Sequence, residues 1–98
     1  MSSFAIAVRV FDGEAPYLQS FIDHHRRLGV DAFYPVLAPG GAPLCREIFA
    51  RNGIAFHESD GQRISSVQDL IREDYVAVVD ADEYLHPGLF DFLIEENV

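Results

Sequence analysis

Three carboxylates follow an uninterrupted apolar segment near the carboxyl end of the chain. The run Tyr75–Val79 carries no charge, and Asp80, Asp82 and Glu83 come soon after it. Side chains two apart on an extended chain project to the same side, so Asp80 and Asp82 can place hard oxygen ligands on one divalent cation. The cation would also neutralise the repulsion between the carboxylates. The spacing predicts a metal or phosphate site. The alternative is a solvated loop in which Asp82 or Glu83 caps the next helix.

The strand that leads into these carboxylates is apolar and β-branched. Such a run is typical of a central strand in a parallel sheet, covered on both faces. Open α/β sheets bind ligands at the carboxyl ends of their strands. Strand and helix patterns alternate along the whole chain, with turn signals between them. Strands are predicted at 4–11, 32–37, 54–57 and 75–79, and helices at 16–28, 43–52, 66–71 and 87–96.

Four strands with intervening helices predict a single α/β domain over residues 1–98. Right-handed crossovers give a three-layer, mostly parallel sheet, a Rossmann-like half domain with strand order 3-2-1-4. In that order the first and fourth strands are neighbours. The turn containing Asp12 and Glu14 would then lie beside Asp80 and Asp82 at the topological switch point.

Two arginines are candidates for the same region. Arg9 lies inside the first apolar strand, where a charge is costly unless it is paired, and its predicted partner is a carboxylate near Asp80. The alternative is an arginine exposed at a sheet edge. Arg63, in the turn before the third helix, is a second candidate for contacting phosphate, with an ordinary solvated side chain as its alternative.

Composition restricts the partners of the chain. Its 98 residues include 7 basic and 16 acidic side chains, a formal net charge of −9. This balance argues against nucleic acid as a partner, and an anionic ligand would need a cation or local arginines. The basic residues are all arginine, which excludes lysine Schiff-base chemistry.

Cysteine and histidine offer no obvious metal site. Cys45 is the single cysteine, so no intramolecular disulfide forms, and a reducing cytoplasmic location is the simplest expectation. No segment has the roughly 18 apolar residues of a membrane span. His24 and His25 are adjacent on a predicted helix and point about 100° apart, which prevents chelation. His25 shares the apolar face of its helix and is predicted to lie in the interior.

Two segments resemble a known family. Glu14–Leu18 followed by Phe21–Tyr34 is similar to the opening of glycosyltransferase family 2 and family 92-like sequences. Val78–Leu85 is similar to their later Asp-x-Asp-Glu segment. The resemblance implies the nucleotide-sugar binding half of a GT-A fold, in which Asp80 and Asp82 hold Mn²⁺ or Mg²⁺ against the diphosphate of a UDP- or GDP-linked sugar. The candidate residues for binding that donor are Arg9, Asp12, Glu14, Arg63, Asp80, Asp82 and Glu83.

The family continues into an acceptor-binding half that carries the general base. That half has no counterpart here, so we expect the donor-binding half alone and assign no catalytic residue. The alternative is a noncatalytic module that forms a homodimer or associates with a second domain. A third class, phosphate chemistry on a receiver-like or phosphatase-like sheet, is disfavoured by the absence of lysine. The predicted core comprises Ile6, Val8, Val10, Leu18, Phe21, Ile22, Leu28, Phe33, Val36, Ile48, Phe49, Ile54, Leu70, Ile71, Val76, Val78, Leu89 and Leu93.

Overall fold

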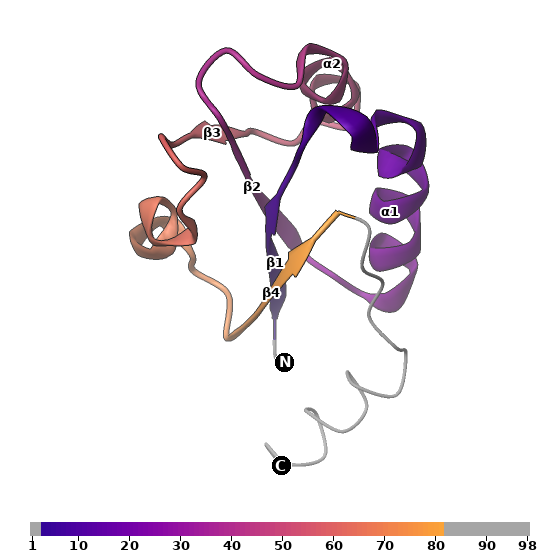
Figure 1. Ribbon diagram of the computed structural model, residues 1–98. Helices are drawn as coiled ribbons and strands as arrows, with labels where there is room; N and C mark the ends of the chain where they lie inside the picture. Colours follow the sequence, from indigo (N-terminus) through magenta and orange to yellow (C-terminus); the bar gives the residue numbers. More distant parts are fainter. Residues whose placement is uncertain (1–2, 82–98) are drawn as a thin grey trace.

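A parallel four-stranded sheet forms the centre of the molecule (Figure 1). The structure is a computed structural model that describes residues 3–81. Every strand pair is parallel, and the order is β3-β2-β1-β4, which confirms the α/β class and the predicted strand order. The strands are β1 (Phe4–Arg9), β2 (Ala32–Leu37), β3 (His57–Glu58) and β4 (Tyr75–Asp80).

Two α-helices begin and end within one residue of the predicted bounds. Helix α1 (Ala15–Leu28) has Pro16 in its first turn, where the missing N–H costs no hydrogen bond. Gly29 ends it in the left-handed conformation, with φ of 102°. Helix α2 (Pro43–Arg51) likewise has a proline in its first turn. A short 3₁₀ turn, η1 (Asp12–Glu14), connects β1 to α1.

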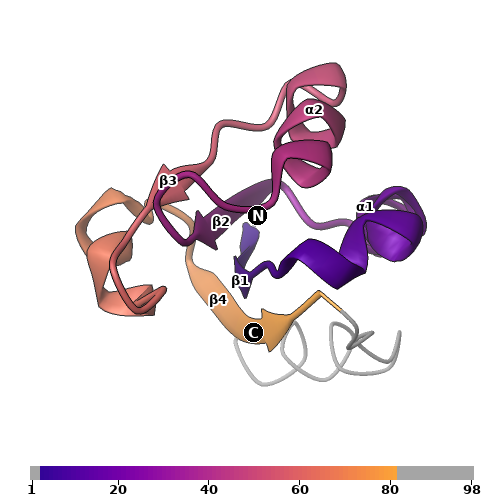
Figure 2. The same ribbon diagram turned by 45° about the horizontal axis from the view of Figure 1, so that its top comes forward.

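The two helices cover one face of the sheet, and two short turns lie on the other (Figure 2). On the helical face, Ile6 and Val8 of β1 pack with Phe21 of α1 and Phe49 of α2 in the main core. The opposite face has a smaller cluster around Val67. None of the helices between residues 3 and 81 has the length and apolar character that crossing a bilayer requires.

The segment predicted as a third helix is not an α-helix. It forms two 3₁₀ turns, η2 (Ile64–Ser66) and η3 (Gln68–Leu70), and neither has a side-chain cap. The predicted Ser66–Asp69 capping box is therefore wrong. Val67 is fully buried against Ala7 and Val36, whereas Leu70 is exposed. One buried anchor fixes a tight turn without the repeating apolar face that an α-helix needs to pack.

Strand β3 is shorter and later than predicted. The prediction covered 54–57, whereas β3 contains only His57 and Glu58, which pair with the end of β2. The reason lies at the end of α2, where the backbone N–H of Ile54 donates to the carbonyl oxygen of Phe49. This hydrogen bond closes the helix, so the backbone at Ile54 belongs to the helix terminus.

Strand β4 lies at the edge of the sheet, which corrects the prediction of a central strand covered on both faces. Tyr75, Ala77 and Val79 pack on the main core. The alternate side chains, Val76 and Val78, are 45% and 56% exposed, so their assignment to the core is wrong. The turns η2 and η3 pack over β1 and β2 and do not bury these two valines. The predicted helix at 87–96, with Leu89 and Leu93, lies outside the described residues.

His25 is a buried histidine inside the main core, as predicted. Its Nδ1 lies 2.8 Å from the carbonyl oxygen of Phe21, one helical turn earlier, and its ring packs against the Phe21 ring. Only a protonated Nδ1 can donate to that carbonyl. Burial lowers the pKa of His25 below its ordinary value of 6.5, because the interior disfavours the imidazolium.

The buried histidine makes stability depend on pH. The unfolded chain binds a proton near pH 6.5 more readily than the native chain, so the contribution of His25 is complete above that pH and is lost as the pH falls through the native pKa. We expect the free energy of unfolding, measured by urea denaturation from pH 7.5 to 5.0, to fall more steeply in the wild type than in His25→Gln. Parallel curves for the wild type and His25→Gln would contradict this assignment.

Candidate functional site

The carboxyl ends of β1 and β4 bring Arg9 and Asp80 together. The parallel register aligns these two residues across the strand pair. Nε of Arg9 donates to Oδ1 of Asp80 at 3.2 Å, and their side chains are 46% and 36% exposed. The ion pair predicted for Arg9 is confirmed, with Asp80 itself as the partner. The pair is accessible to solvent at the sheet edge where ligands of α/β proteins bind.

Asp80 is suited to hold a divalent ion, but only as one member of a ligand set. Within residues 3–81, no three His, Cys, Asp or Glu side chains gather closely enough to share a metal ion. Asp82 and Glu83 lie outside the described residues. Mg²⁺ and similar ions are often bound by one or two carboxylates and complete their coordination with phosphate and water. The accessible carboxylate of Asp80 fits that role.

The connection from β1 to α1 borders the same edge of the sheet. Its turn η1 is closed by Glu14, whose Oε1 accepts the backbone N–H of Phe11 at 2.7 Å and whose own N–H donates to the Phe11 carbonyl. Asp12 begins this turn. Helix α1 starts immediately afterwards at Ala15, so the partial positive charge of its N-terminus lies at the carboxyl side of the sheet. The carboxylate of Glu14 thus has a structural role in shaping this connection.

Gln62 joins the carboxyl ends of β1 and β2, and the sequence gave no indication of this role. Its Nε2 donates to the carbonyl oxygens of Val10 at 2.7 Å and Val36 at 3.2 Å. Because both partners are acceptors, the orientation of the amide is fixed and Oε1 remains as an acceptor. Gln62 has a φ of 50°, an unfavourable backbone conformation for a residue other than glycine. A glutamine in a turn carries no sequence signal for contacts with such distant strands.

The loop after β2 is fixed by Arg46 of α2. The guanidinium donates to the carbonyl oxygens of Gly41 at 2.6 Å and Ala38 at 3.1 Å, and to the carboxylate of Glu58 at 2.6 Å. The hydrogen bond from Arg46 lowers the pKa of Glu58. Ala42 at the end of this loop has a φ of 51°. Two of the three hydrogen bonds from Arg46 thus hold the loop that ends in the unfavourable backbone conformation of Ala42.

A cavity of about 100 Å³ lies between these two segments at the carboxyl ends of β1 and β2. Among the described residues, Ala42 and Gln62 are the two non-glycine positions with positive φ, and both border this cavity. Unfavourable backbone conformations gather at binding sites, so their coincidence marks the cavity as a candidate ligand site. Its lining residues are Val10, Phe11, Ala38, Gly41, Ala42 and Gln62.

No protein-family model, curated protein or solved structure matches the chain. The chemistry of this edge of the sheet is therefore the basis for assigning a function. It combines an accessible carboxylate beside a guanidinium with a small cavity whose walls are fixed by side-chain hydrogen bonds.

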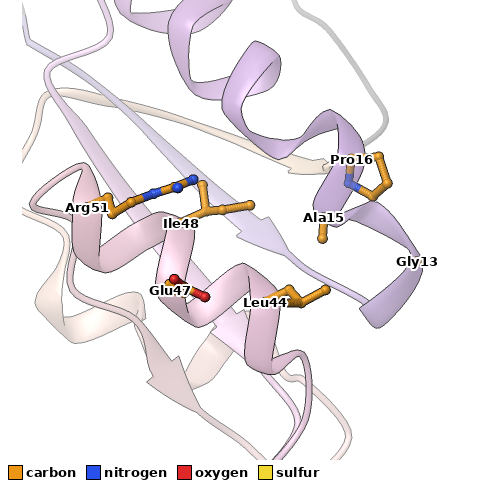
Figure 3. Close-up of a pocket in the computed structure, with 7 residues that line it drawn as sticks. All are labelled: Gly13, Ala15, Pro16, Leu44, Glu47, Ile48 and Arg51. Carbon is orange, nitrogen blue, oxygen red and sulfur yellow. The ribbon is translucent and has the colours of Figure 1, made fainter.

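A larger hollow of about 530 Å³ lies in the helical layer, between the start of α1 and one side of α2 (Figure 3). Its walls include Pro16, Leu44 and Ile48, with Glu47 and Arg51 as the charged side chains. Neither Arg9 nor Asp80 borders it. A hollow with few polar groups to orient a ligand gives no indication of a specific chemistry.

Arg63, the second arginine predicted to contact phosphate, lies beside this edge of the sheet next to Gln62. Its side chain is exposed, and its backbone N–H donates to the hydroxyl of Ser59 at 3.2 Å.

Replacing Gln62 with methionine tests the bridge between β1 and β2. The substitution keeps the length of the side chain but removes the donor to two strand-end carbonyls. The carbonyl oxygen of Val36 keeps its hydrogen bond from the N–H of Val10, whereas that of Val10 loses the Gln62 donor. One unsatisfied acceptor near the interior costs about 1–3 kcal/mol, so we expect the free energy of unfolding in urea to fall by about that amount. Gln68→Met, on the exposed turn η3, is the matched control and should change stability by less than about 0.5 kcal/mol. Equal effects of the two substitutions would show that the Gln62 bridge contributes nothing to stability.

Proposed function

We propose that this chain binds a nucleotide sugar, with a divalent ion on Asp80 and Asp82 holding the diphosphate. The observation that supports this most is the strand order β3-β2-β1-β4, which aligns Asp80 with the carboxyl end of β1 at a topological switch point. The β1–α1 connection, with the N-terminus of α1, borders the same place. Glu83, directly after Asp82 in the sequence, belongs to the same proposed site.

A bound divalent ion would offset the repulsion between the acidic chain and the anionic diphosphate. The chain has a formal net charge of −9, so a diphosphate is repelled unless a cation stands between it and the protein. When bound, Mn²⁺ or Mg²⁺ stabilises the charge that develops on a departing diphosphate. Asp80 supplies one oxygen ligand on the sheet edge, and Arg9 supplies positive charge beside it. Arg63 is proposed to add positive charge for the phosphate groups.

The base of the nucleotide is proposed to enter the cavity bounded by Gln62. A volume of about 100 Å³ is well below the roughly 300–1,000 Å³ of pockets that hold complete ligands, so this cavity suits a single planar base. Oε1 of Gln62 is then an acceptor for a ring N–H, which both uracil and guanine possess. The diphosphate would extend from there towards β4.

Calorimetry with UDP and GDP tests the proposal. In the presence of Mn²⁺ we expect a binding isotherm with at least one of them, and the heat should disappear when EDTA removes the metal. Asp80→Asn should weaken Mn²⁺ binding at least about tenfold, because a charged ligand becomes neutral. Asp69→Asn, exposed on η3, is the control for a lost surface carboxylate and should bind like the wild type. Metal-independent binding, or an Asp80→Asn variant that binds normally, would refute the proposal.

A second proposal, association through β4, follows from its exposed side chains. Strand β4 is at the edge of the sheet, and Val76 and Val78 are substantially exposed on one face. Edge strands with apolar side chains are sites of pairing with another chain, so this surface would receive a second copy or a further domain.

Light scattering across a concentration series tests self-association. We expect the apparent mass to rise towards that of a dimer, and Val78→Lys to return the chain to a monomer by placing a charge at the interface. Tyr17→Lys, which changes an exposed aromatic residue on α1, is the control and should leave the dimer intact. A monomer at every concentration would exclude the homodimer.

A further inference from the structure

We infer that two copies of this chain pair edge to edge through β4, antiparallel and about a two-fold axis at Ala77, so that two four-stranded sheets become one. The inference rests on the proposed association through β4 and adds the partner, the direction of the strands and their register. Strand β4 has β1 on one side, and its other side is the outer edge of the sheet (Figure 2).

The outer edge of β4 presents backbone groups that no neighbouring strand uses. The N–H of Tyr75 donates to the carbonyl oxygen of Ser3 at 3.0 Å, so the backbone groups of Tyr75 face β1. In a parallel ladder alternate residues bond to the same neighbour, which directs Ala77 to β1 as well. Val76 and Val78 therefore point their N–H and C=O groups outward. No strand within residues 3–81 lies on that side to accept or donate.

This edge lacks the features that usually prevent strand pairing. Edge strands are normally protected by charged side chains, by proline or by a bulge. The segment 75–79 has no charge and no proline, and its register with β1 is unbroken. The exposed side chains of Val76 and Val78 add apolar surface beside the open backbone. A chain with a net charge of −9 approaches a second copy most closely where there is no carboxylate.

The sequence of β4 is self-complementary about Ala77. Val76, Ala77 and Val78 read the same in both directions, so a two-fold axis at Ala77 sets each valine opposite the other valine of the second copy. Because both valines direct their backbone outward, each such pair can exchange both of its N–H···O bonds. The two alanines meet at the axis, where antiparallel strands approach to about 4.5 Å between Cα atoms. A small side chain suits that distance.

The charges at the two ends of β4 favour the antiparallel direction. Arg72 precedes the strand and is exposed, and Asp80 ends it. In this register Arg72 of the second copy is the diagonal neighbour of Asp80, within reach of a long side chain. Asp74 of the second copy lies opposite Asp80, but the N–H and hydroxyl of Ser3 hold its carboxylate towards β1. Parallel pairing in register would align Asp80 with its own copy, and the like charges would repel.

Hydrogen exchange of the β4 amides tests the strand pairing. In ¹H–¹⁵N spectra of the full chain, the amides of Val76 and Val78 should exchange about tenfold more slowly in a concentrated than in a dilute sample, because pairing gives them acceptors. The amides of Ala77 and Val79 already face β1 in the single chain, so they are internal controls and should change far less.

A proline substitution separates the backbone edge from the apolar side chains. Val76→Pro removes an outward N–H and no hydrogen bond to β1, so it should leave the fold intact and abolish the dimer in light scattering. Val76→Thr keeps the shape of the side chain and the backbone donor, and should still form the dimer. Loss of the dimer in Val76→Thr with its retention in Val76→Pro would contradict pairing through the backbone.

Cysteine substitutions test the register. Ala77→Cys lies on the axis and should form an intermolecular disulfide under mild oxidation, because the two Cα atoms are close enough to be bridged. Val78→Cys is the control. It is more exposed, but in this register it lies about 7–8 Å from its own copy and should not cross-link. Cys45 is fully buried and does not compete.

The outcomes separate this inference from the proposed association. Concentration-independent exchange at Val76 and Val78, in a chain that light scattering shows to be a dimer, overturns the strand pairing and leaves association through the side chains. Slow exchange of these amides at every concentration shows that the edge is covered within one chain and overturns it as well. Equal cross-linking of Ala77→Cys and Val78→Cys overturns the register. A monomer at every concentration overturns both the association and the pairing.

Discussion

The parallel register between β1 and β4 determines which charged side chains meet at the carboxyl edge of the sheet. It aligns Arg9 with Asp80 at the carboxyl end of the sheet, where the two side chains form an accessible ion pair. A register shift by one residue would turn Arg9 to the opposite face, into the apolar core under α1. The apolar packing of Ile6 and Val8 on that face therefore fixes both the stability of the strand pair and the position of its charged end.

The second constraint is the fixed geometry of the loops beside this edge. Arg46 holds the loop after β2, and Gln62 donates to the carbonyl of Val10, directly after β1, and to that of Val36 near the end of β2. Both segments include a residue with positive φ, Ala42 and Gln62, and those residues meet at one cavity. Side-chain hydrogen bonds thus maintain an unfavourable backbone on both sides of this cavity.

The sequence was informative where local signals are strong. Proline in the first turn and glycine after the last turn predicted α1, and the alternation of strands and helices predicted the sheet order. The predictions failed where tertiary packing decides the structure. One anchor, Val67, sufficed to hold a pair of 3₁₀ turns, and the edge position of β4 left Val76 and Val78 exposed. An apolar strand sequence cannot distinguish a central strand from an edge strand.

The candidate site likewise contains residues whose contacts could be predicted from the sequence and residues whose contacts could not. The pairing of Arg9 was predictable because a charge in an apolar strand needs a partner, and strand order identified Asp80. Gln62 was not predictable, because its hydrogen bonds reach strands that lie 26 and 52 residues earlier in the chain. No pattern of neighbouring residues carries that information. The pairing of Asp80 with Arg9 thus follows from chain topology. The cavity beside them depends instead on hydrogen bonds that form only when the loops are folded.

Paramagnetic broadening of amide resonances by Mn²⁺ would test the central claim most directly. In a ¹H–¹⁵N spectrum of the chain with UDP or GDP, substoichiometric Mn²⁺ should first broaden the amides of Arg9, Val10, Val79, Asp80 and Ala81, because broadening falls steeply with distance from the ion. Asp80→Asn should abolish that pattern. Broadening centred instead on other acidic surfaces, such as Glu47 or Asp69, would contradict a metal site at the junction of β1 and β4.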